Sequence, residues 1–355
     1  MKKIAFILAG VLALSAVSCN KTSGVDEPAA AKVKLSVGIT TPATRATGVT
    51  AQAGRNDSSD EAKVNTLQVF VFNGDALDGY GSSTGSMEAT VSCTAGSRDI
   101  YALVNAPSSL NSITSKAALL ASVSTLVEDP DNFEMIGSKT ETLQFDGKVT
   151  IPVDRLAARI VIRKITNGFD NDAQANDFKL ESIYITNATG DVNYGLSSDY
   201  APALWYNKRG YEASNNLGSF NYDAIPAASQ TIAKGASHET AHFFYSMPNG
   251  YEGKVGLAAG ETAFTPRAVR LLIRVRIAGT LYNYPILFPA LQSNRSYEIN
   301  ELVITRVGNP DDDKHDPDDP DDIDEEKPIV GFEQGFEITV NDWTVVLVDG
   351  GNITI

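Results

Sequence analysis

The sequence predicts an all-β protein, and three observations support this. Valine, isoleucine, threonine, tyrosine and phenylalanine recur in short runs that are separated by glycine, asparagine, aspartate and proline. Segments with the apolar period of a helix are scarce. The length of 355 residues allows two domains and an ample core. We therefore expect an all-β architecture with a domain boundary near Pro152.

The chain begins with the features of a secretory leader. Lys2 and Lys3 form a basic start, residues 4–17 form an apolar run, and small residues precede Cys19. The apolar run is too short to span a bilayer. Residues 16–19 end in a lipobox-like pattern, so we expect residues 1–18 to be a lipoprotein signal peptide and Cys19 to carry the lipid. An ordinary signal peptide that happens to contain a cysteine is the alternative.

A strand and a small-residue loop follow the leader. Residues 33–40 alternate apolar and polar side chains, which is typical of a half-buried strand. The apolar positions of this strand are Val33, Leu35, Val37 and Ile39. The loop after it holds one basic residue, Arg45, and cleavage between Arg45 and Ala46 would separate the strand from the rest of the chain. Taken by itself, a solvated loop arginine without function is the simpler interpretation.

The remaining elements are mostly strands. One helix is expected over residues 115–128, with Ser115 as its N-cap. The apolar face of this helix would consist of Leu119, Leu120, Val123, Leu126 and Val127. Strands are expected at residues 64–72, 98–104, 149–153, 159–165, 178–187, 242–247, 269–278, 281–288 and 296–307.

Cysteine usage excludes an intrachain disulfide. The chain has two cysteines, and lipidation would consume Cys19. Cys93 is then left without a partner, so the stability of this exported protein must come from sheet packing.

An acidic stretch accounts for most of the net charge of −15. Residues 311–326 hold eleven acidic residues and one lysine, with repeated proline and aspartate. Such a stretch repels itself and cannot bury a core, so we expect an extended linker over residues 309–328. Calcium binding is the alternative, although the spacing lacks the glycine turn and terminal glutamate of an EF-hand. The acidity argues against nucleic-acid binding, which needs basic patches.

The tail at residues 329–355 is β-prone. Residues 336–340 alternate, and residues 343–348 are rich in β-branched side chains. Its apolar positions include Phe336, Ile338, Val340, Trp343, Val345 and Leu347. Because the tail lies beyond the acidic linker, it can move relative to the preceding domain, and an exposed strand of this kind needs a receiving groove.

One catalytic pattern occurs, and we reject it. Residues 238–242 fit H-E-x-x-H, which forms a zinc-protease site when a helix places both histidines on one face. Here Gly235 precedes His238, and an aromatic strand-like run follows His242, so a loop leading into a strand is the better interpretation. Nucleophile–base pairs, phosphate loops and cofactor fingerprints do not appear elsewhere. We therefore expect no catalytic residues, metal or cofactor, and no enzyme activity.

Several motifs, in order and spacing, resemble the major fimbrial subunits (fimbrillins, or type V pilins) of Bacteroidales. They occur at residues 44–46, 67–73, 101–107, 153–159, 297–300 and 340–343, in addition to the leader with Cys19. The resemblance covers nearly the whole chain and departs from the family in the length of the acidic linker.

The resemblance implies two transthyretin-like β-sandwich domains, here residues 46–152 and 153–355. It implies export as an outer-membrane lipoprotein, with residues 19–45 as a propeptide that an Arg-specific protease removes after Arg45. Loss of the first strand, with Val33, Leu35, Val37 and Ile39, would open a groove. The C-terminal strand of another fimbrial subunit would fill this groove by β-augmentation. The product would be the shaft of a cell-surface fimbria that supports adhesion to a host or bacterial receptor.

A second class of function stays open. A surface lipoprotein adhesin that never polymerises, a fimbrial tip or an anchor would share the leader and the sandwiches. A tip needs the groove but no donor strand, whereas an anchor donates a strand but needs no cleavage. The presence of both Arg45 and a detachable tail favours the shaft.

Overall fold

The computed structural model describes residues 31–41, 59–208, 213–251, 264–311, 339–342 and 352–354. For residues 59–60, 339–342 and 352–354 it describes the backbone. Among these residues the α-helices are α1 (Lys116–Ala121) and α2 (Asp172–Ala175), and strands dominate the rest. The all-β prediction with a short helix is therefore confirmed.

Two facing sheets form what we call the N-terminal sandwich. The first sheet has the order β4-β1-β8 and the second has the order β3-β2-β5-β7-β9. Their bounds are β1 Lys32–Thr40, β2 Thr66–Asn73, β3 Ala76–Thr84, β4 Glu88–Thr94, β5 Gly96–Val104, β7 Met135–Leu143, β8 Gly147–Pro152 and β9 Asp154–Arg155. Apolar side chains from both sheets meet in one buried cluster between them.

Three further sheets form what we call the C-terminal sandwich. Their orders are β18-β10-β21-β24, β17-β11-β22-β25 and β16-β12-β19-β20-β23. The bounds are β10 Ala158–Ile162, β11 Ile165–Asn167, β12 Phe178–Thr186, β16 Tyr222–Ala224, β17 Ser237–His238, β18 His242–Ser246, β19 Arg270–Ile277, β20 Thr280–Leu287, β21 Arg295–Ile299, β22 Glu301–Ile304, β23 Asn309–Pro310, β24 Thr339–Asp342 and β25 Asn352–Thr354. A second buried cluster of apolar side chains, drawn from the chain between Ala158 and Ile304, lies between these sheets.

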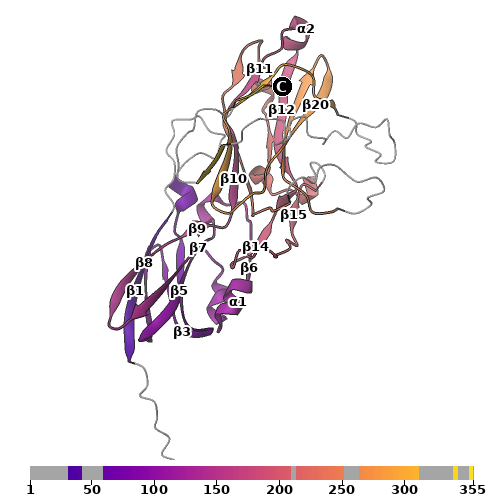
Figure 1. The fold of residues 1–355 in the computed structure, drawn as a ribbon. Coiled ribbons are helices and arrows are strands. Elements are labelled where there is room, and N and C mark those ends of the chain that lie inside the picture. The colour runs from indigo at the N-terminus through magenta and orange to yellow at the C-terminus, as the bar shows by residue number, and fades with distance from the viewer. Residues whose placement is uncertain are drawn as a thin grey trace, which may run out of the picture.

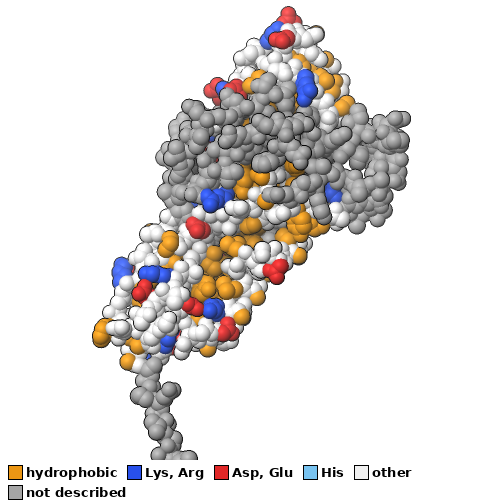
Figure 2. All heavy atoms as spheres, viewed as in Figure 1, with side chains coloured by type: hydrophobic (Ala, Val, Ile, Leu, Met, Phe, Trp, Pro, Cys, Tyr) orange, Lys and Arg blue, Asp and Glu red, His pale blue; other side chains and the backbone are white. Residues whose placement is uncertain are grey.

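The two sandwiches lie end to end and share a third apolar cluster (Figure 1). Phe70 and Phe133 enter this cluster from one side, and Phe220 and Tyr245 enter it from the other. Short strand pairs lie at and near the junction, namely β6 (Val123–Thr125) with β14 (Asp191–Asn193) and β13 (Ala188–Thr189) with β15 (Trp205–Tyr206). On the face in Figure 2 charges of both signs are interspersed over the described surface. A domain division at residue 152 stays a prediction.

The predicted helix at residues 115–128 is too long. Ser115 caps α1 as expected, because its hydroxyl accepts a hydrogen bond from the Ala118 N–H at 3.1 Å. The helix ends at Ala121, and β6 begins at Val123 and pairs with β14. The β-branched residues of β6 find a strand partner, and this tertiary pairing outweighs the apparent helical period.

The sheet also extends beyond the predicted start of the acidic linker. Asn309 and Pro310 form β23, which pairs with β20. Asp311 accepts a hydrogen bond from the Asn283 side chain at 2.8 Å and forms an ion pair with Arg274. Residues 309–311 are therefore part of the C-terminal sandwich, and residues 312–328 lie outside the described residues.

Candidate functional site

Strand β1 is held on both sides within its sheet. It runs antiparallel to β4, with Val33 opposite Cys93. It runs parallel to β8, with Ile39 opposite Ile151. Since each edge of β1 has a hydrogen-bonded neighbour, its removal would leave an open slot between two strands that are not otherwise paired with each other.

The inward face of β1 completes the core of the N-terminal sandwich. Val33, Leu35, Val37 and Ile39 are each no more than 5% exposed. They belong to the same cluster as the buried residues of β2 and β5 in the opposite sheet. Burying four such side chains stabilises the fold by about 6–12 kcal/mol, at about 1.5–3 kcal/mol each. Strand β1 is therefore part of the folded core.

Polar contacts fix the register of β1 on its outer face. The Lys34 N–H donates to the Asp146 carboxylate at 2.6 Å. The Glu88 carboxylate on β4 accepts a hydrogen bond from the Ser36 hydroxyl and pairs with Lys148 on β8. The Lys148 ammonium and the Ser36 hydroxyl hold the pKa of Glu88 below its usual range. These contacts are solvent-exposed, so they define alignment more than stability.

The far end of β1 reaches the junction of the two sandwiches. The Val153 N–H donates to the Thr40 carbonyl at 3.0 Å. A cavity of about 400 Å³ opens beside Thr40 and Thr41, and Asn294 and Arg295 of the C-terminal sandwich also line it. Arg45 and Ala46, and likewise Cys19, lie outside the described residues.

The chain is anchored again at Glu61, in the short 3-10 turn Ser59–Ala62. The Glu61 side chain is buried and pairs with the Arg159 guanidinium at 2.9 Å. The Tyr245 hydroxyl donates to the same carboxylate, and Arg155 Nε donates to the Glu61 carbonyl at 2.7 Å. Burial lowers the pKa of Arg155 to about 10, although the nearby Glu61 charge opposes this shift.

The network continues across the C-terminal sandwich. Arg163 donates to the Glu298 carboxylate from Nε at 3.0 Å and from Nη2 at 2.7 Å. Arg159 lies 3.5 Å from the other Glu298 oxygen and donates to Ser296 Oγ at 3.0 Å. We call Glu61, Arg159, Arg163 and Glu298 the buried ion-pair network. Through it, the segment after residue 58 is fixed to β10 and β21, while β1 is fixed to β4 and β8.

The described parts of the C-terminal tail pair as edge strands. β24 pairs antiparallel with β21, where Val340 lies opposite Tyr297. β25 pairs parallel with β22, where Ile353 lies opposite Leu302. Each is terminal in its sheet among the described strands, whereas β1 is central. Phe336, Ile338, Trp343, Val345 and Leu347 lie outside the described residues.

The H-E-x-x-H residues lie on strands. His238 ends β17 and His242 begins β18, so the helix that a zinc protease needs is absent here. The two imidazoles nevertheless approach each other, with their Nε2 atoms 2.9 Å apart. Burial and the neighbouring His242 lower the pKa of His238 to about 4. Among the described residues, no group of three or more His, Cys, Asp or Glu side chains gathers to hold a metal.

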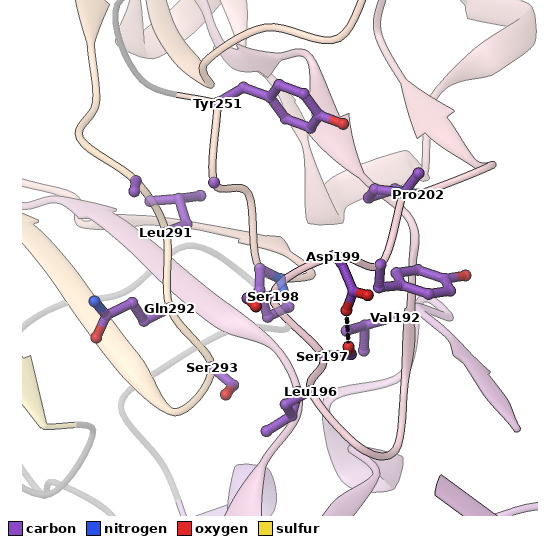
Figure 3. Close-up of a pocket in the computed structure, with 15 residues that line it drawn as sticks. Val192, Leu196, Ser197, Ser198, Asp199, Pro202, Tyr251, Leu291, Gln292 and Ser293 are labelled. Carbon is purple, nitrogen blue, oxygen red and sulfur yellow. Dashed lines mark hydrogen bonds between the residues drawn. The ribbon is translucent and has the colours of Figure 1, made fainter. Parts of the chain in front are cut away.

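A cavity of about 550 Å³ lies between loops of the C-terminal sandwich (Figure 3). The Asp199 carboxylate accepts a hydrogen bond from Ser197, and Tyr251 and Leu291 form part of the apolar wall. The described lining contains neither histidine, lysine nor cysteine. Within the described part of the chain, no helix is long and apolar enough to cross a membrane.

Two features of the site were not predicted from the sequence. Strand β4, the partner of β1, was missed although Ala89, Val91 and Cys93 alternate with polar residues, which is the signal that could have found it. The buried ion-pair network was missed because its members are far apart in sequence. A single glutamate in a polar segment gives no local sign that it is buried.

Comparisons with known proteins agree with the predicted resemblance. Residues 31–152 match the family of the major fimbrial subunit protein (FimA), which confirms the resemblance for this part of the chain. No curated protein matches the sequence.

Solved structures share the fold at low identity. A proposed cell adhesion protein from Bacteroides eggerthii is 18% identical with a TM-score of 0.58, covering 87% of this chain and 95% of that chain. A proposed cell adhesion protein from Parabacteroides distasonis is 17% identical with a TM-score of 0.53, covering 77% and 89%. A fimbrilin from Porphyromonas gingivalis is 17% identical with a TM-score of 0.51, covering 78% and 91%.

Proposed function

We propose that this chain is a structural subunit of a cell-surface fimbria, of the shaft type. In this proposal it is exported as a lipoprotein through Cys19, cleaved after Arg45 by an Arg-specific protease, and polymerised with other fimbrial subunits by strand exchange. The central position of β1 is the observation that carries the proposal. β1 is a core strand, yet residues 42–58 are its only covalent link to the rest of the chain after the leader is removed.

The energetics explain why cleavage would lead to assembly. Loss of β1 would expose an apolar core and two unpaired strand edges. Burial of the four apolar β1 side chains contributes a stabilising free energy of about 6–12 kcal/mol. This is comparable to the whole free energy of unfolding of a typical domain, which is about 5–15 kcal/mol. A cleaved subunit therefore needs a replacement strand, and uncleaved β1 keeps the slot occupied until export is complete.

The C-terminal tail is the donor in this proposal. Its alternating positions, which include Phe336, Ile338 and Val340, match the period of β1. β24 and β25 each leave their sheets by breaking one ladder, whereas β1 must break two. Cleavage removes the peptide link that holds β1 to the rest of its subunit. Because the tail strands lie at sheet edges, detaching the tail for donation costs less free energy than detaching a central strand.

The buried ion-pair network adds a second support. It holds Glu61 against the C-terminal sandwich, so the new N-terminal segment stays attached after the propeptide departs. Removal of β1 then need not displace the segment that follows the cut. A host or bacterial surface receptor remains part of the proposal through the adhesion role.

The test is to incubate the purified precursor with an Arg-specific protease and to analyse the products on a denaturing gel without boiling. We expect a ladder of stable oligomers, and N-terminal sequencing of the assembled subunits should begin at Ala46. Arg45→Ala should remain a folded monomer under the same treatment. Assembled fibres that begin at Cys19 or Val33 would contradict the proposed cleavage.

The same assay separates the competing roles. A tip subunit would accept a donor strand after cleavage but would not lengthen the ladder. An anchor would donate its tail without being cleaved. A non-polymerising adhesin would give monomers from both the wild type and Arg45→Ala.

A further inference from the structure

A hydrogen bond joins the rings of His238 and His242, which we call the histidine pair. Their Nε2 atoms lie 2.9 Å apart, and the planes of the two rings are 21° apart. The Asp223 carboxylate lies 3.0 Å from Nδ1 of His242, and both of these side chains are buried. The three side chains come from β16, β17 and β18, so one hydrogen-bonded chain links three strands.

The hydrogen-bonded chain has room for one proton at each contact. A carboxylate accepts hydrogen bonds, so Nδ1 of His242 carries a proton and donates it to Asp223. In the neutral His242 ring Nε2 is then an acceptor, and His238 donates its own Nε2 proton to it. One added proton leaves a single proton between the two Nε2 atoms. When both rings are imidazolium, two N–H groups meet without a lone pair, so the contact must break.

The histidine pair lies where a bent sheet changes direction at its edge. Residues 239–241 separate β17 from β18, and the neighbouring strand is interrupted between β10 and β11 at the same level. β17 is two residues long and, among the described strands, pairs only with β11, where Ile165 lies opposite His238. The contact from His238 to His242 therefore ties this short strand to β18, all of whose residues are buried.

The strand beside the histidine pair presents apolar residues to it. Ile162 and Ile165 lie opposite the two histidines in the ladders of β18 and β17. The two cations between these isoleucines, Arg163 and Lys164, are each paired with a glutamate of β21 or β22. Glu239 follows the first histidine and is exposed, so solvent screens its charge. The charged groups in contact with the pair are therefore its own rings and Asp223.

We infer that Asp223, His242 and His238 form an acid-sensitive latch, which holds edge strand β17 on β11 at neutral pH and releases it when both rings are protonated. Release would leave one edge of β11 unpaired, while β22 still pairs with the other edge. The inference is independent of the proposed fimbrial function, because the histidine pair takes no part in the β1 ladder.

The pH window of the latch follows from the two states of His238. In the closed latch, burial and the charge of a protonated His242 lower the pKa of His238 to about 4. Once released, the ring should titrate near the usual histidine pKa of about 6.5. The closed state is therefore fully favoured above about pH 6.5. Between about pH 6.5 and about pH 4, its population relative to the open state falls by up to about tenfold for each unit that the pH falls.

The experiment is hydrogen exchange of the backbone amides from about pH 7 to about pH 4, measured by nuclear magnetic resonance and expressed as protection factors. The Asn167 N–H donates to the Ala236 carbonyl at 3.0 Å and reports release of the β17 segment. The adjacent Gly168 N–H donates to the Ile304 carbonyl at 2.9 Å, on the other side of β11, and is the internal control. Protection of Asn167 relative to Gly168 should fall by at least about tenfold over this range.

His238→Gln is the matched variant, because its amide N–H can still donate to His242 but does not titrate. Relative protection of Asn167 should then stay constant as the pH falls. Constant relative protection in the wild type, or an equal loss in a folded His238→Gln, would overturn the inference.

Ring nitrogen spectra of the wild type test the latch without substitution. At neutral pH they should place the proton of His242 on Nδ1 and that of His238 on Nε2. The third histidine, His315, is identified by the loss of its signals in His315→Gln. Should both rings of the histidine pair titrate near about pH 6.5, as free histidines do, the latch does not exist.

Discussion

Val33 of β1 lies directly opposite Cys93 of β4, and both side chains are buried in the core of the N-terminal sandwich. Ala31 and Ala95, the equivalent pair two residues along the ladder, are joined by a hydrogen bond of 2.7 Å. Val33 and Cys93 are therefore a hydrogen-bonded pair, with Cα atoms about 5.5 Å apart. This separation is inside the disulfide range of about 4.4–6.8 Å.

Val33→Cys should lock β1 in its slot through a disulfide with Cys93. In a Cys19→Ser background, the oxidised variant should be cleaved after Arg45 but should not form a ladder, and reduction should restore assembly. Lys34→Cys is the control, since Lys34 is exposed and lies opposite Ser92 rather than Cys93. If the oxidised Val33→Cys protein polymerises like the wild type, β1 is not the strand that leaves.

The buried ion-pair network should be sensitive to the loss of one member. Arg159→Met removes the cation that lies between Glu61 and Glu298, so unfolding in urea should show a loss of about 3–5 kcal/mol. Lys63→Ala is the matched control, because the Lys63–Asp131 pair is solvent-exposed. Its loss should be at most about 1 kcal/mol. Equal effects of the two substitutions would show that burial of the network carries no special cost.

Glu134 should make stability fall as pH rises. Burial raises the pKa of Glu134, although the hydrogen bond from the Tyr194 hydroxyl opposes this shift. The native chain then holds this proton to a higher pH than the unfolded chain does. The stabilisation is present below the usual glutamate pKa and is lost as pH rises through the native pKa.

Glu134→Gln removes this titration while keeping a hydrogen-bonding side chain. The measurement is urea unfolding of both proteins from about pH 4 to about pH 8. The wild type should lose stability relative to Glu134→Gln as pH increases. A difference between the two proteins that stays constant, or changes in the opposite direction, would contradict the raised pKa.

Local patterns predicted β1 well and its surroundings poorly. The strict alternation from Val33 to Ile39 is a local signal, and the structure places those four side chains in the core. β3 was missed because it is rich in glycine and serine. At Gly81 an added Cβ would lie 2.3 Å from the Thr90 carbonyl oxygen, so the close approach of β4 requires glycine at this position. The side chain that would have contributed to a strand pattern is therefore missing.

The histidine pair shows the same difference between what local sequence patterns predict and what tertiary structure brings together. The sequence indicated a loop leading into a strand at residues 238–242, but it gave no sign that the rings of His238 and His242 meet. In the structure the two Nε2 atoms, at the end of β17 and the start of β18, lie 2.9 Å apart, and Asp223 contacts His242 from a third strand, β16. Such convergence depends on tertiary structure, which a five-residue pattern does not contain.

The predicted lipid anchor is tested by Cys19→Ser. The acyl chains would contribute about 0.8 kcal/mol per buried methylene to membrane binding. The variant should therefore move from the membrane fraction to the soluble fraction, while Cys93→Ser should not. Cys93 is buried in β4 and is not available to a lipid-transfer enzyme in the folded chain. Unchanged partition of Cys19→Ser would count against lipidation.

The tail prediction concerns the strand that replaces β1. Deleting residues 335–355 should leave a precursor that is cleaved but forms no fibres in electron microscopy, because no subunit can then donate a strand. β24 and β25 are edge strands, so we expect their loss to perturb the C-terminal sandwich less than the loss of a central strand would.

Ile338→Asp and Val345→Asp are finer probes, since each puts a charge at a predicted inward position of the donor. Truncating one large buried donor side chain should cost about 2–5 kcal/mol per subunit interface. Thermal melting of each precursor is the control, and normal fibres from the truncated chain would show that the donor strand lies elsewhere.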